Sequence, residues 1–355
     1  MHYFLSDEGC EPFLLEEMRR CYPRDTHQQH APRWVASDMP LDPASPPRLV
    51  FSRQCLPDAV EQEAESIRQW SEAIQTAVLG PLPETQPWRL HTAPLYSFEA
   101  SDMPANASTA GEYRCGLIRD SLRERLKKVR RTLLRSWEDG YEPLSKEHSL
   151  VQVVLVAADR GFVSVARAPL AHSCRTVISP YPLGEIPGAV DKTAPSRAFA
   201  KLVEAEKRLG HAITKGETVV DLGASPGSWS FVSLERGASV TAVDRSALRD
   251  DLMQHSQLTF IATDAFAFKP DGVPVDWLLC DVIAAPDRTI ALLLQWIRER
   301  RMRKFVVTVK FKGQAEYALL DALTNELPSH CSEYGITRLC ANKNEACIFG
   351  VVANS

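Results

Sequence analysis

The residues best suited to chemistry stand where five short apolar runs end in the second half of the chain. Four of these runs end at or lead into an aspartate and the fifth ends in a lysine: Asp221, Asp244, Asp264, Asp281 and Lys310. Carboxylates accept hydrogen bonds from ribose hydroxyls and from an exocyclic amine. A buried lysine beside another cation can remove a proton near neutral pH, because both conditions lower its pKa. Together these residue types predict a site for an adenosyl ligand with a base next to it.

A glycine turn follows the first of these runs, in the stretch Val219–Trp229 (VVDLGASPGSW). Its glycines, Gly223 and Gly227, are four residues apart, whereas a dinucleotide pyrophosphate is held by the pattern Gly-x-Gly-x-x-Gly. The pattern found here, with Asp221 before it, suits a ligand with a cationic amino-acid tail such as S-adenosylmethionine. The alternative at this point is a plain turn between a strand and a helix that binds no ligand.

The strand-end acids have distinct expected partners, because ligands of open α/β sheets lie outside the carboxyl ends of the strands. Asp244 is expected to accept hydrogen bonds from both ribose hydroxyls, and Asp264 from the adenine amino group. Asp281 is expected to orient Lys310 from the neighbouring strand. A single aspartate at a strand end is as often a helix cap, but four of them beside the glycine turn favour the ligand site.

The elements that position these residues alternate regularly from about residue 196. Strands are expected at 218–222, 239–244, 259–262, 277–281, 305–311, 336–341 and 346–352, and helices at 196–209, 229–235, 289–300 and 314–326. Such alternation predicts a doubly wound sheet. Only four residues separate the last two strands, so an antiparallel hairpin is expected at one edge. The predicted fold class is α/β, a Rossmann-like methyltransferase domain with a mostly parallel seven-stranded sheet and an antiparallel edge hairpin.

From about residue 180 to the end, the chain resembles the FtsJ-like RNA ribose 2′-O-methyltransferases, and among them those that modify a cytidine of large-subunit ribosomal RNA. The resemblance is carried by the glycine turn and the segments APSRAFAKL, CDV, TVK and NEAC. It implies a catalytic tetrad on Lys201, Asp281, Lys310 and Glu345, with Lys310 as general base and S-adenosyl-L-methionine as cofactor. The predicted cofactor contacts are Ser196, Gly223, Ser225, Pro226, Gly227, Ser228, Asp244, Asp264 and Asp281.

Two positions of the glycine turn depart from that family. Ser228 stands where the family usually has a second glycine after Pro-Gly, and Ser225 stands where it has Cys or Ala. Both side chains are small, so cofactor binding is still expected. Methylation of a base amino group is not indicated, because Asp281 is followed by Val-Ile-Ala and not by the Pro-Pro-Tyr that holds a flipped base. Methylation of cytosine C5 is not indicated either, because no Pro-Cys nucleophile stands at this edge and Cys280 is expected in the core.

The first half of the chain is expected to hold two smaller modules, residues 1–80 and 81–178, ahead of the methyltransferase domain at 179–355. In the first module, helices are expected at 10–21 and within 58–79, and a strand at 49–54. The second module begins with a strand near Trp88 and ends in a hairpin over 151–166. It resembles the RNA-binding THUMP fold, so an α+β THUMP-like RNA-binding region is predicted before the Rossmann-like domain.

A long basic helix is expected at 116–137, in the second module. Its apolar stripe is expected to comprise Leu117, Leu122, Leu126, Val129, Leu133 and Leu134. Its other face is either an ordinary solvated surface or a set of contacts to RNA phosphates. The cations on that face are Arg119, Arg123, Lys127, Arg130 and Arg131.

Composition limits the class of protein. The net charge of −4 means that affinity for RNA has to come from a local basic face and not from the chain as a whole. Nine scattered cysteines without any Cys-x-x-Cys indicate reduced thiols, with no zinc or other metal. The sequence has no run of eighteen apolar residues and no signal-like start, so a cytoplasmic protein without a membrane span is expected. Nothing in the sequence indicates the oligomeric state.

Three other functions compete with ribosomal RNA 2′-O-methylation. A non-catalytic RNA-binding protein with a retired methyltransferase domain is one, although an intact tetrad argues against it. An O-methyltransferase of another RNA is the second. An O-methyltransferase of a small molecule or a protein is the third, and the basic helix and the two preceding modules favour RNA over it.

Overall fold

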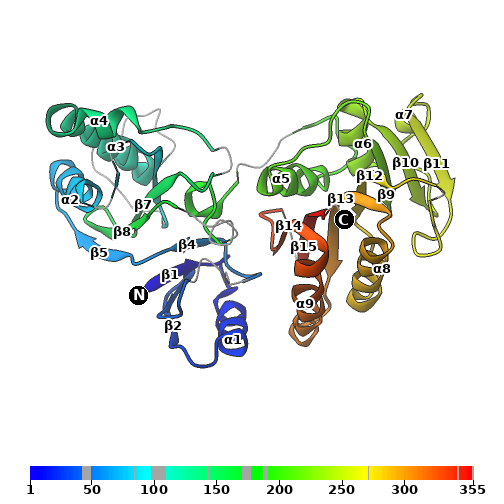
Figure 1. The fold of residues 1–355 in the computed structure, drawn as a ribbon, viewed down its shortest axis with the longest axis horizontal. Coiled ribbons are helices and arrows are strands. Elements are labelled where there is room, and N and C mark those ends of the chain that lie inside the picture. The colour runs from blue at the N-terminus through cyan, green and yellow to red at the C-terminus, as the bar shows by residue number, and fades with distance from the viewer. Residues whose placement is uncertain are drawn as a thin grey trace. The chain divides into compact units, whose positions relative to one another are not determined.

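The computed structural model describes residues 1–41, 49–80, 82–83, 85–96, 109–141, 144–169, 177–186, 191–270, 272–341 and 344–353. The chain divides into two compact units, Met1–Ile186 and Pro187–Ser355 (Figure 1). Within the described residues, the first unit has two four-stranded sheets and the second has one seven-stranded sheet. The division of the first half into modules at 1–80 and 81–178, and the likeness of the second to a THUMP fold, stay predictions.

The first sheet of the N-terminal unit is antiparallel, in the order β2-β3-β1-β4. Its elements are β1 (His2–Leu5), α1 (Glu11–Cys21), β2 (His27–Ala31), β3 (Trp34–Ser37) and β4 (Gln54–Leu56). The helix α1 lies where the apolar spacing predicts it. The strand expected at 49–54 is wrong in position, because the backbone N–H groups of Val50 and Phe51 donate to Glu17, at 2.9 and 3.2 Å, and not to a neighbouring strand.

The second sheet of this unit has the order β5-β8-β7-β6. Its elements are β5 (Val60–Glu63), α2 (Ile67–Leu79), β6 (Trp88–Pro94), α3 (Ala110–Val129), α4 (Arg131–Arg135), β7 (Ser149–Leu155) and β8 (Arg160–Ala166), and the short turn η2 (Pro182–Gly184) follows. The predicted hairpin is β7 and β8, and β6 runs parallel to β7. Only α2 of the helices expected within 58–79 forms, because 60–63 pairs with β8 and because Ser66 and Gln69 make a capping box that starts the helix.

The long basic helix differs from its prediction in extent and in orientation. It begins at Ala110, after Thr109 whose hydroxyl accepts a hydrogen bond from the backbone of Glu112, and it breaks at Arg130 into α3 and α4. Leu117 and Val129 are exposed, so they do not belong to the apolar stripe as expected. The buried stripe comprises Cys115, Ile118, Leu122, Leu126 and Leu133, which pack with the core of the second sheet.

The C-terminal unit contains the predicted sheet, in the order β11-β10-β9-β12-β13-β15-β14. Its strands are β9 (Thr218–Leu222), β10 (Ser239–Asp244), β11 (Leu258–Ala262), β12 (Val275–Cys280), β13 (Met302–Lys310), β14 (Cys331–Thr337) and β15 (Glu345–Val352). The strands from β11 to β13 are parallel, and β15 is antiparallel to both of its neighbours. The prediction of a mostly parallel seven-stranded sheet with an antiparallel edge hairpin is therefore confirmed. The order of the sheet reverses between β9 and β12, which is where open α/β sheets bind their ligands.

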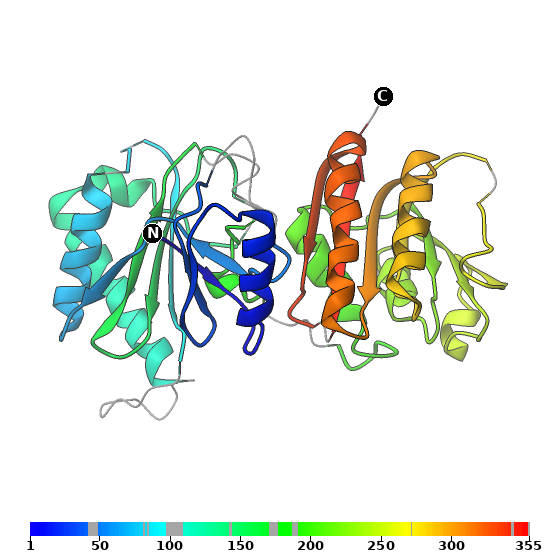
Figure 2. The ribbon, with the colours of Figure 1, turned by 90° about the horizontal axis from the view of Figure 1, so that it is seen from below.

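Helices cover both faces of this sheet. They are α5 (Phe199–Leu209), α6 (Ser228–Glu235), α7 (Asp250–Met253), α8 (Pro286–Arg298), the 3₁₀ helix η3 (Gln314–Leu320) and α9 (Asp321–His330). Helices α8 and α9 lie side by side on one face, while α5 and α6 lie on the other (Figure 1, Figure 2). The α5 and α6 face encloses a large apolar core that includes Trp229, Trp277 and Phe349.

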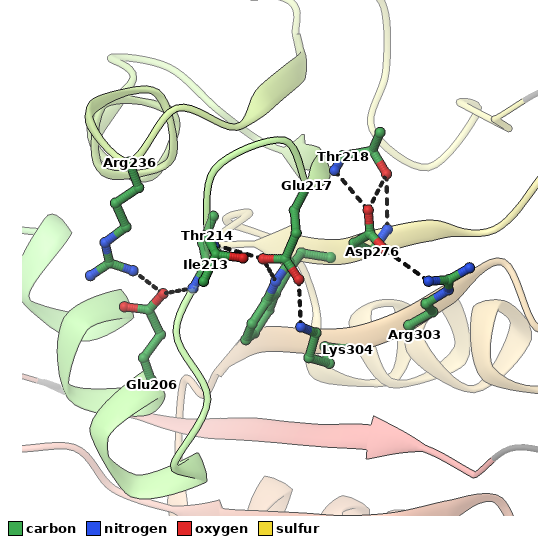
Figure 3. Close-up of polar contacts among 10 residues, drawn as sticks. Glu206, Ile213, Thr214, Glu217, Thr218, Arg236, Asp276, Arg303 and Lys304 are labelled. Atoms are coloured by element: carbon green, nitrogen blue, oxygen red, sulfur yellow. Dashed lines mark hydrogen bonds and ion pairs between the residues drawn. The ribbon is translucent and has the colours of Figure 1, made fainter.

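A polar network ties together the amino ends of the central strands, at the edge opposite to the predicted site (Figure 3). Glu217 accepts hydrogen bonds from Lys304 Nζ at 2.6 Å and from Trp277 Nε1 at 3.0 Å. Asp276 accepts from the backbone and hydroxyl of Thr218, both at 2.9 Å. These carboxylates are occupied by protein donors, so we interpret this network as structural.

Candidate active site

The glycine turn requires glycine at both of its predicted positions. Gly223 and Gly227 have φ angles of +74° and +109°, which L side chains rarely adopt. A Cβ on Gly223 would lie 2.5 Å from Val282 Cγ1, and a Cβ on Gly227 would lie 2.4 Å from Leu252 Cδ1. The turn is therefore packed closely against Val282 and Leu252, and only glycine fits at these two positions.

Asp221, the acid before the turn, is not available to a ligand. Its side chain is 1% exposed, and Ser230 Oγ donates a hydrogen bond to its Oδ2 at 2.7 Å. Burial, together with the nearby Asp281, raises the pKa of Asp221 to about 7, although the hydrogen bonds from Ser230 act in the opposite direction. The sequence suggested that this carboxylate would face a cationic tail, and the structure turns it into the core instead.

The titration of Asp221 is expected to make folding stability depend on pH. Because the pKa in the folded state, about 7, lies above the value of about 3.9 in an unfolded chain, the folded state binds more protons between these values. Stability contributed by this group is therefore present at low pH and is lost as the pH rises towards 7. Asp221→Asn keeps an acceptor for Ser230 and removes the buried charge. We therefore expect it to raise the unfolding free energy at pH 8 by an amount of the order of a few kcal/mol. At pH 4.5 we expect no such increase.

Urea unfolding at the two pH values measures this difference. The matched control is Asp250→Asn, which neutralises an exposed aspartate and is expected to change stability similarly at both. An Asp221→Asn variant whose stability runs parallel to that of the wild type over this pH range would contradict the account.

The predicted cofactor acids Asp244 and Asp264 lie at the carboxyl edge of the sheet. Asp244 accepts hydrogen bonds from the backbone N–H of Ser225 at 3.0 Å and of Ser246 at 2.8 Å, one on each oxygen. A carboxylate has about four acceptor positions, so Asp244 keeps capacity for two more donors. Asp264 accepts from the backbone of Phe266 at 2.9 Å and pairs with Arg245. The backbone bond and that arginine lower the pKa of Asp264, so it is a charged acceptor.

Ser228, which replaces a glycine of the FtsJ-like pattern, has a structural partner. Its hydroxyl lies 2.7 Å from the hydroxyl of Ser196, another predicted cofactor position. The next residue, Trp229, donates from its indole nitrogen to the carbonyl of Ala198 at 2.8 Å. The start of α6 is thus tied to the segment that leads into α5, an interaction that glycine at position 228 could make only in part.

The four residues of the predicted tetrad come together from four elements. Lys310 ends β13 and is the direct strand partner of Glu345, which begins β15. Lys201 lies on α5, with its Nζ 2.5 Å from Glu345 Oε1 and 3.4 Å from both carboxylate oxygens of Asp281. Lys310 Nζ donates to the backbone carbonyl of Asp281 at 2.8 Å and lies 3.0 Å from its Oδ1. Asp281 is therefore at the centre of the cluster.

The charge state of Lys201 follows from its two carboxylate neighbours. Its side chain is 12% exposed, and burial alone would lower its pKa. Asp281 and Glu345 more than offset burial, and the net effect raises the pKa of Lys201 above its usual value. Lys201 is thus a permanent cation inside the cluster.

Thr308 belongs to this cluster and was not predicted. It is fully buried on β13, and its hydroxyl donates to Asp281 Oδ1 at 2.5 Å. Residues two apart on a strand face the same side, so Thr308 and Lys310 both reach Asp281. That spacing was the signal available in the sequence.

The cations of the basic helix differ in their exposure and in whether they pair with a carboxylate. Arg123 pairs with Asp139 at 2.5 Å and lies over Trp137, and Lys127 pairs with Glu124 at 2.5 Å. Arg119 and Arg131 are exposed, and Arg130 is half-buried. Within the part of the chain that the structure describes, three exposed cations near the end of the helix have no carboxylate partner: Lys128, Arg131 and Arg135.

Metal binding and membrane insertion are two further properties on which the described residues bear. No group of three or more His, Cys, Asp or Glu side chains is placed there to hold a metal ion. None of the helices in the same residues is long and apolar enough to cross a membrane.

Comparison with known proteins gives relatives for the C-terminal unit. Residues 194–323 match the model of the FtsJ-like methyltransferase family. The protein named ribosomal RNA large subunit methyltransferase M from Laribacter hongkongensis is 39% identical over 153 residues, 41% of this chain and 43% of that protein. Proteins of the same name from Pseudomonas putida F1 and from Azoarcus sp. BH72 are 33% identical over 185 and 155 residues.

These matches span less than half of the length of each relative, 49% for the Pseudomonas protein and 42% for the Azoarcus protein. The family model includes the glycine turn, Lys201, Asp281 and Lys310, while Glu345 lies beyond it. The sheet order and the glycine turn agree with this match, so residues 194–323 of the chain are similar to the FtsJ-like methyltransferase family.

Proposed function

We propose that this protein transfers the methyl group of S-adenosyl-L-methionine to the 2′-oxygen of a ribose in RNA, with Lys310 as the general base. The observation that carries the proposal is the cluster of Lys201, Asp281, Lys310 and Glu345 at the carboxyl edge of the sheet, where the strand order reverses. The names of the curated relatives support large-subunit ribosomal RNA as the substrate, and the resemblance noted above supports a cytidine as the target.

Asp281 orients the amine of Lys310 through two acceptors. An uncharged lysine has two N–H donors and one lone pair, and Asp281 provides two acceptors, its backbone carbonyl at 2.8 Å and its Oδ1 at 3.0 Å. With both donors engaged, the lone pair is the part of the amine left to accept a proton. Lys310 would take the 2′-hydroxyl proton as the oxygen forms its new bond to carbon.

The other members of the cluster hold Lys310 in place. Asp281 fixes the amine through its two acceptors, and Thr308 and Lys201 fix Asp281 in turn. Glu345 neutralises Lys201 from the other side, at 2.5 Å.

The residues around the glycine turn fit the cofactor. Glycine lets the turn pack against Val282 and Leu252 with a left-handed backbone, and Asp244 keeps acceptor capacity for ribose hydroxyls. We propose that these residues hold the cofactor, with Ser196, Ser225, Pro226 and Ser228 shaping the turn and Asp264 near the adenine. When bound, the cofactor would supply a methyl group attached to a sulfonium. Loss of the methyl group turns the sulfonium into a neutral thioether, which favours the transfer.

We propose that the end of the basic helix contacts RNA phosphates. Phosphate contacts give affinity and salt dependence but no sequence information. The sequence pointed to Arg119, Arg123, Lys127, Arg130 and Arg131, but two of these, Arg123 and Lys127, already pair with carboxylates. At the end of the helix, Lys128, Arg131 and Arg135 have no such partner among the described residues and are the better candidates there.

Neutralising these three cations is expected to weaken RNA binding. For the triple variant Lys128→Gln, Arg131→Gln and Arg135→Gln, the slope of log affinity against log salt should fall by about 2 to 3. Filter binding to large-subunit RNA between 50 and 200 mM salt, roughly the range where such contacts dominate, measures it. The double variant Arg123→Gln and Lys127→Gln is the matched control and should change the slope less. An unchanged slope in the triple variant would show that the helix is merely solvated.

Transfer of label to total RNA tests the proposed substrate class. Purified protein and tritiated S-adenosylmethionine are incubated with RNA from cells that lack this protein, and RNA, protein and small molecules are separated. We expect label in the large-subunit RNA fraction. Label confined to protein or to small molecules would overturn the proposal in favour of another O-methyltransferase, and no label anywhere would favour a non-catalytic RNA-binding protein.

A further inference from the structure

One aliphatic side chain stands out at the edge of the sheet that carries the tetrad. Ile283 is 92% exposed, and it follows Asp281 by two residues, on the segment between β12 and α8. Two residues of chain span at most about 7 Å, so the backbone of Ile283 lies within the length of one nucleotide of Asp281. Single exposed apolar residues are common on protein surfaces, so the position of Ile283 matters more than its exposure alone.

The exposure of Ile283 is built into the packing around it. The preceding residue, Val282, is buried and occupies the space that the missing side chain of Gly223 leaves free. The backbone N–H of Asp281 donates to Leu222 at 3.3 Å, so the chain is still held to β9 at this point. A chain fixed at Asp281 and Val282 leaves Ile283 outside the core.

The segment is also held at its far end. Helix α8 begins at Pro286, and the guanidinium of Arg288 lies 4.1 Å from the ring centroid of Phe266, which follows the predicted adenine residue Asp264. Only three residues separate Val282 from the helix. Ile283 is therefore presented on a short segment that is anchored on both sides.

We propose that Ile283 contacts the target nucleoside, packing its apolar side chain against the base or sugar of the nucleotide whose 2′-hydroxyl faces Lys310. This inference rests on the proposed function. The charged groups of the cluster are engaged with one another, so they offer little to the apolar surface of a nucleoside, whereas an aliphatic side chain suits it. A contact of this kind requires an unstacked nucleotide, so the substrate is a ribose in a locally unpaired segment.

The test compares two exposed aliphatic residues at opposite ends of β12. Ile283→Ser removes the proposed contact, and Val273→Ser, at a residue that is 82% exposed before the strand begins, is the matched control. We expect Ile283→Ser to lower kcat/KM for RNA roughly tenfold, the order of effect of one buried aliphatic side chain. The Kd for S-adenosylmethionine should not change, Ile283→Leu should restore most of the activity, and Val273→Ser should behave as the wild type.

Other results would overturn the inference in distinguishable ways. If Ile283→Ser keeps kcat/KM for RNA within twofold of the wild type, Ile283 does not contact the nucleoside, and the proposed function is unaffected. If its Kd for S-adenosylmethionine rises as much as kcat/KM falls, Ile283 contacts the cofactor and not the nucleoside. If the wild-type protein methylates no RNA, the proposed function fails, and this inference fails with it.

Discussion

Lys310→Ala is expected to lower the rate of methyl transfer by at least about 100-fold, the lower range for loss of a general base. The variant removes the amine that Asp281 holds through two hydrogen bonds, while the glycine turn and Asp244 are left in place. Binding of S-adenosylmethionine should therefore stay near that of the wild type. Single-turnover transfer to RNA and calorimetric titration of the cofactor measure the two quantities.

Lys310→Arg tests whether residue 310 acts as a general base or only through its positive charge. Arginine is always protonated in proteins, so it preserves positive charge but cannot accept a proton. We expect it to be as inactive as Lys310→Ala. Substantial activity in the arginine variant would mean that residue 310 acts by its charge, and full activity in the alanine variant would remove it from the mechanism.

Asp281→Asn is expected to have the second largest effect, a loss of activity of the order of 100-fold. The neutral amide takes away the charge that faces Lys201 and Lys310. If its oxygen keeps the Oδ1 position that accepts from Thr308 and Lys310, its NH₂ group takes the Oδ2 position and turns a donor toward the Lys201 ammonium. Lys201 would then face a donor where it now has an acceptor, and the cluster would lose the central charge that holds the two lysines in place. Steady-state kcat with saturating RNA measures the effect.

Asp276→Asn is the matched control for this variant. Asp276 lies at the other end of β12 and accepts from Thr218 and Arg303, away from the cluster. It is expected to lower the unfolding free energy without a comparable loss of kcat. If the two variants lose stability and activity in the same proportion, Asp281 has a structural role only.

The fold of the C-terminal unit could be predicted because its pattern is regular. Each strand is a short apolar run and each helix begins after a turn, so strands β9 and β10 were placed with the bounds that the structure gives them. The antiparallel edge hairpin was correctly predicted, but its outer strand was misplaced: it was expected at 336–341 and lies at Cys331–Thr337, so its connection to β15 is longer than the four residues expected. The region predicted as a helix at 314–326 divides into η3 and α9, and periodicity alone cannot distinguish a 3₁₀ turn from the start of an α-helix.

The grouping of the candidate residues could be predicted for those at strand ends, whereas the hydrogen-bond partners of individual side chains could not. The structure brings Lys201, Asp281, Lys310 and Glu345 within contact of one another, as the resemblance implied. The inward turn of Asp221 depends on Ser230, nine residues away on α6, and no local pattern reveals it.

The basic helix shows a similar limit. Leu117 and Val129 were wrongly assigned to its buried stripe. The helix starts earlier than predicted, at Ala110, and Cys115 and Ile118 near that start belong to the face that packs on the sheet. The pairing of Arg123 with Asp139 also depends on the chain turning back after α4, which the sequence did not indicate.

The most direct test of 2′-O-methylation is alkaline hydrolysis of the labelled product. Large-subunit RNA lacking the modification is methylated with tritiated S-adenosylmethionine, then hydrolysed and separated by size. A methyl group on the 2′-oxygen blocks cleavage of the adjacent phosphodiester, so the account predicts label in an alkali-resistant dinucleotide that begins with cytidine. Label in mononucleotides would place the methyl group on a base and would contradict the account.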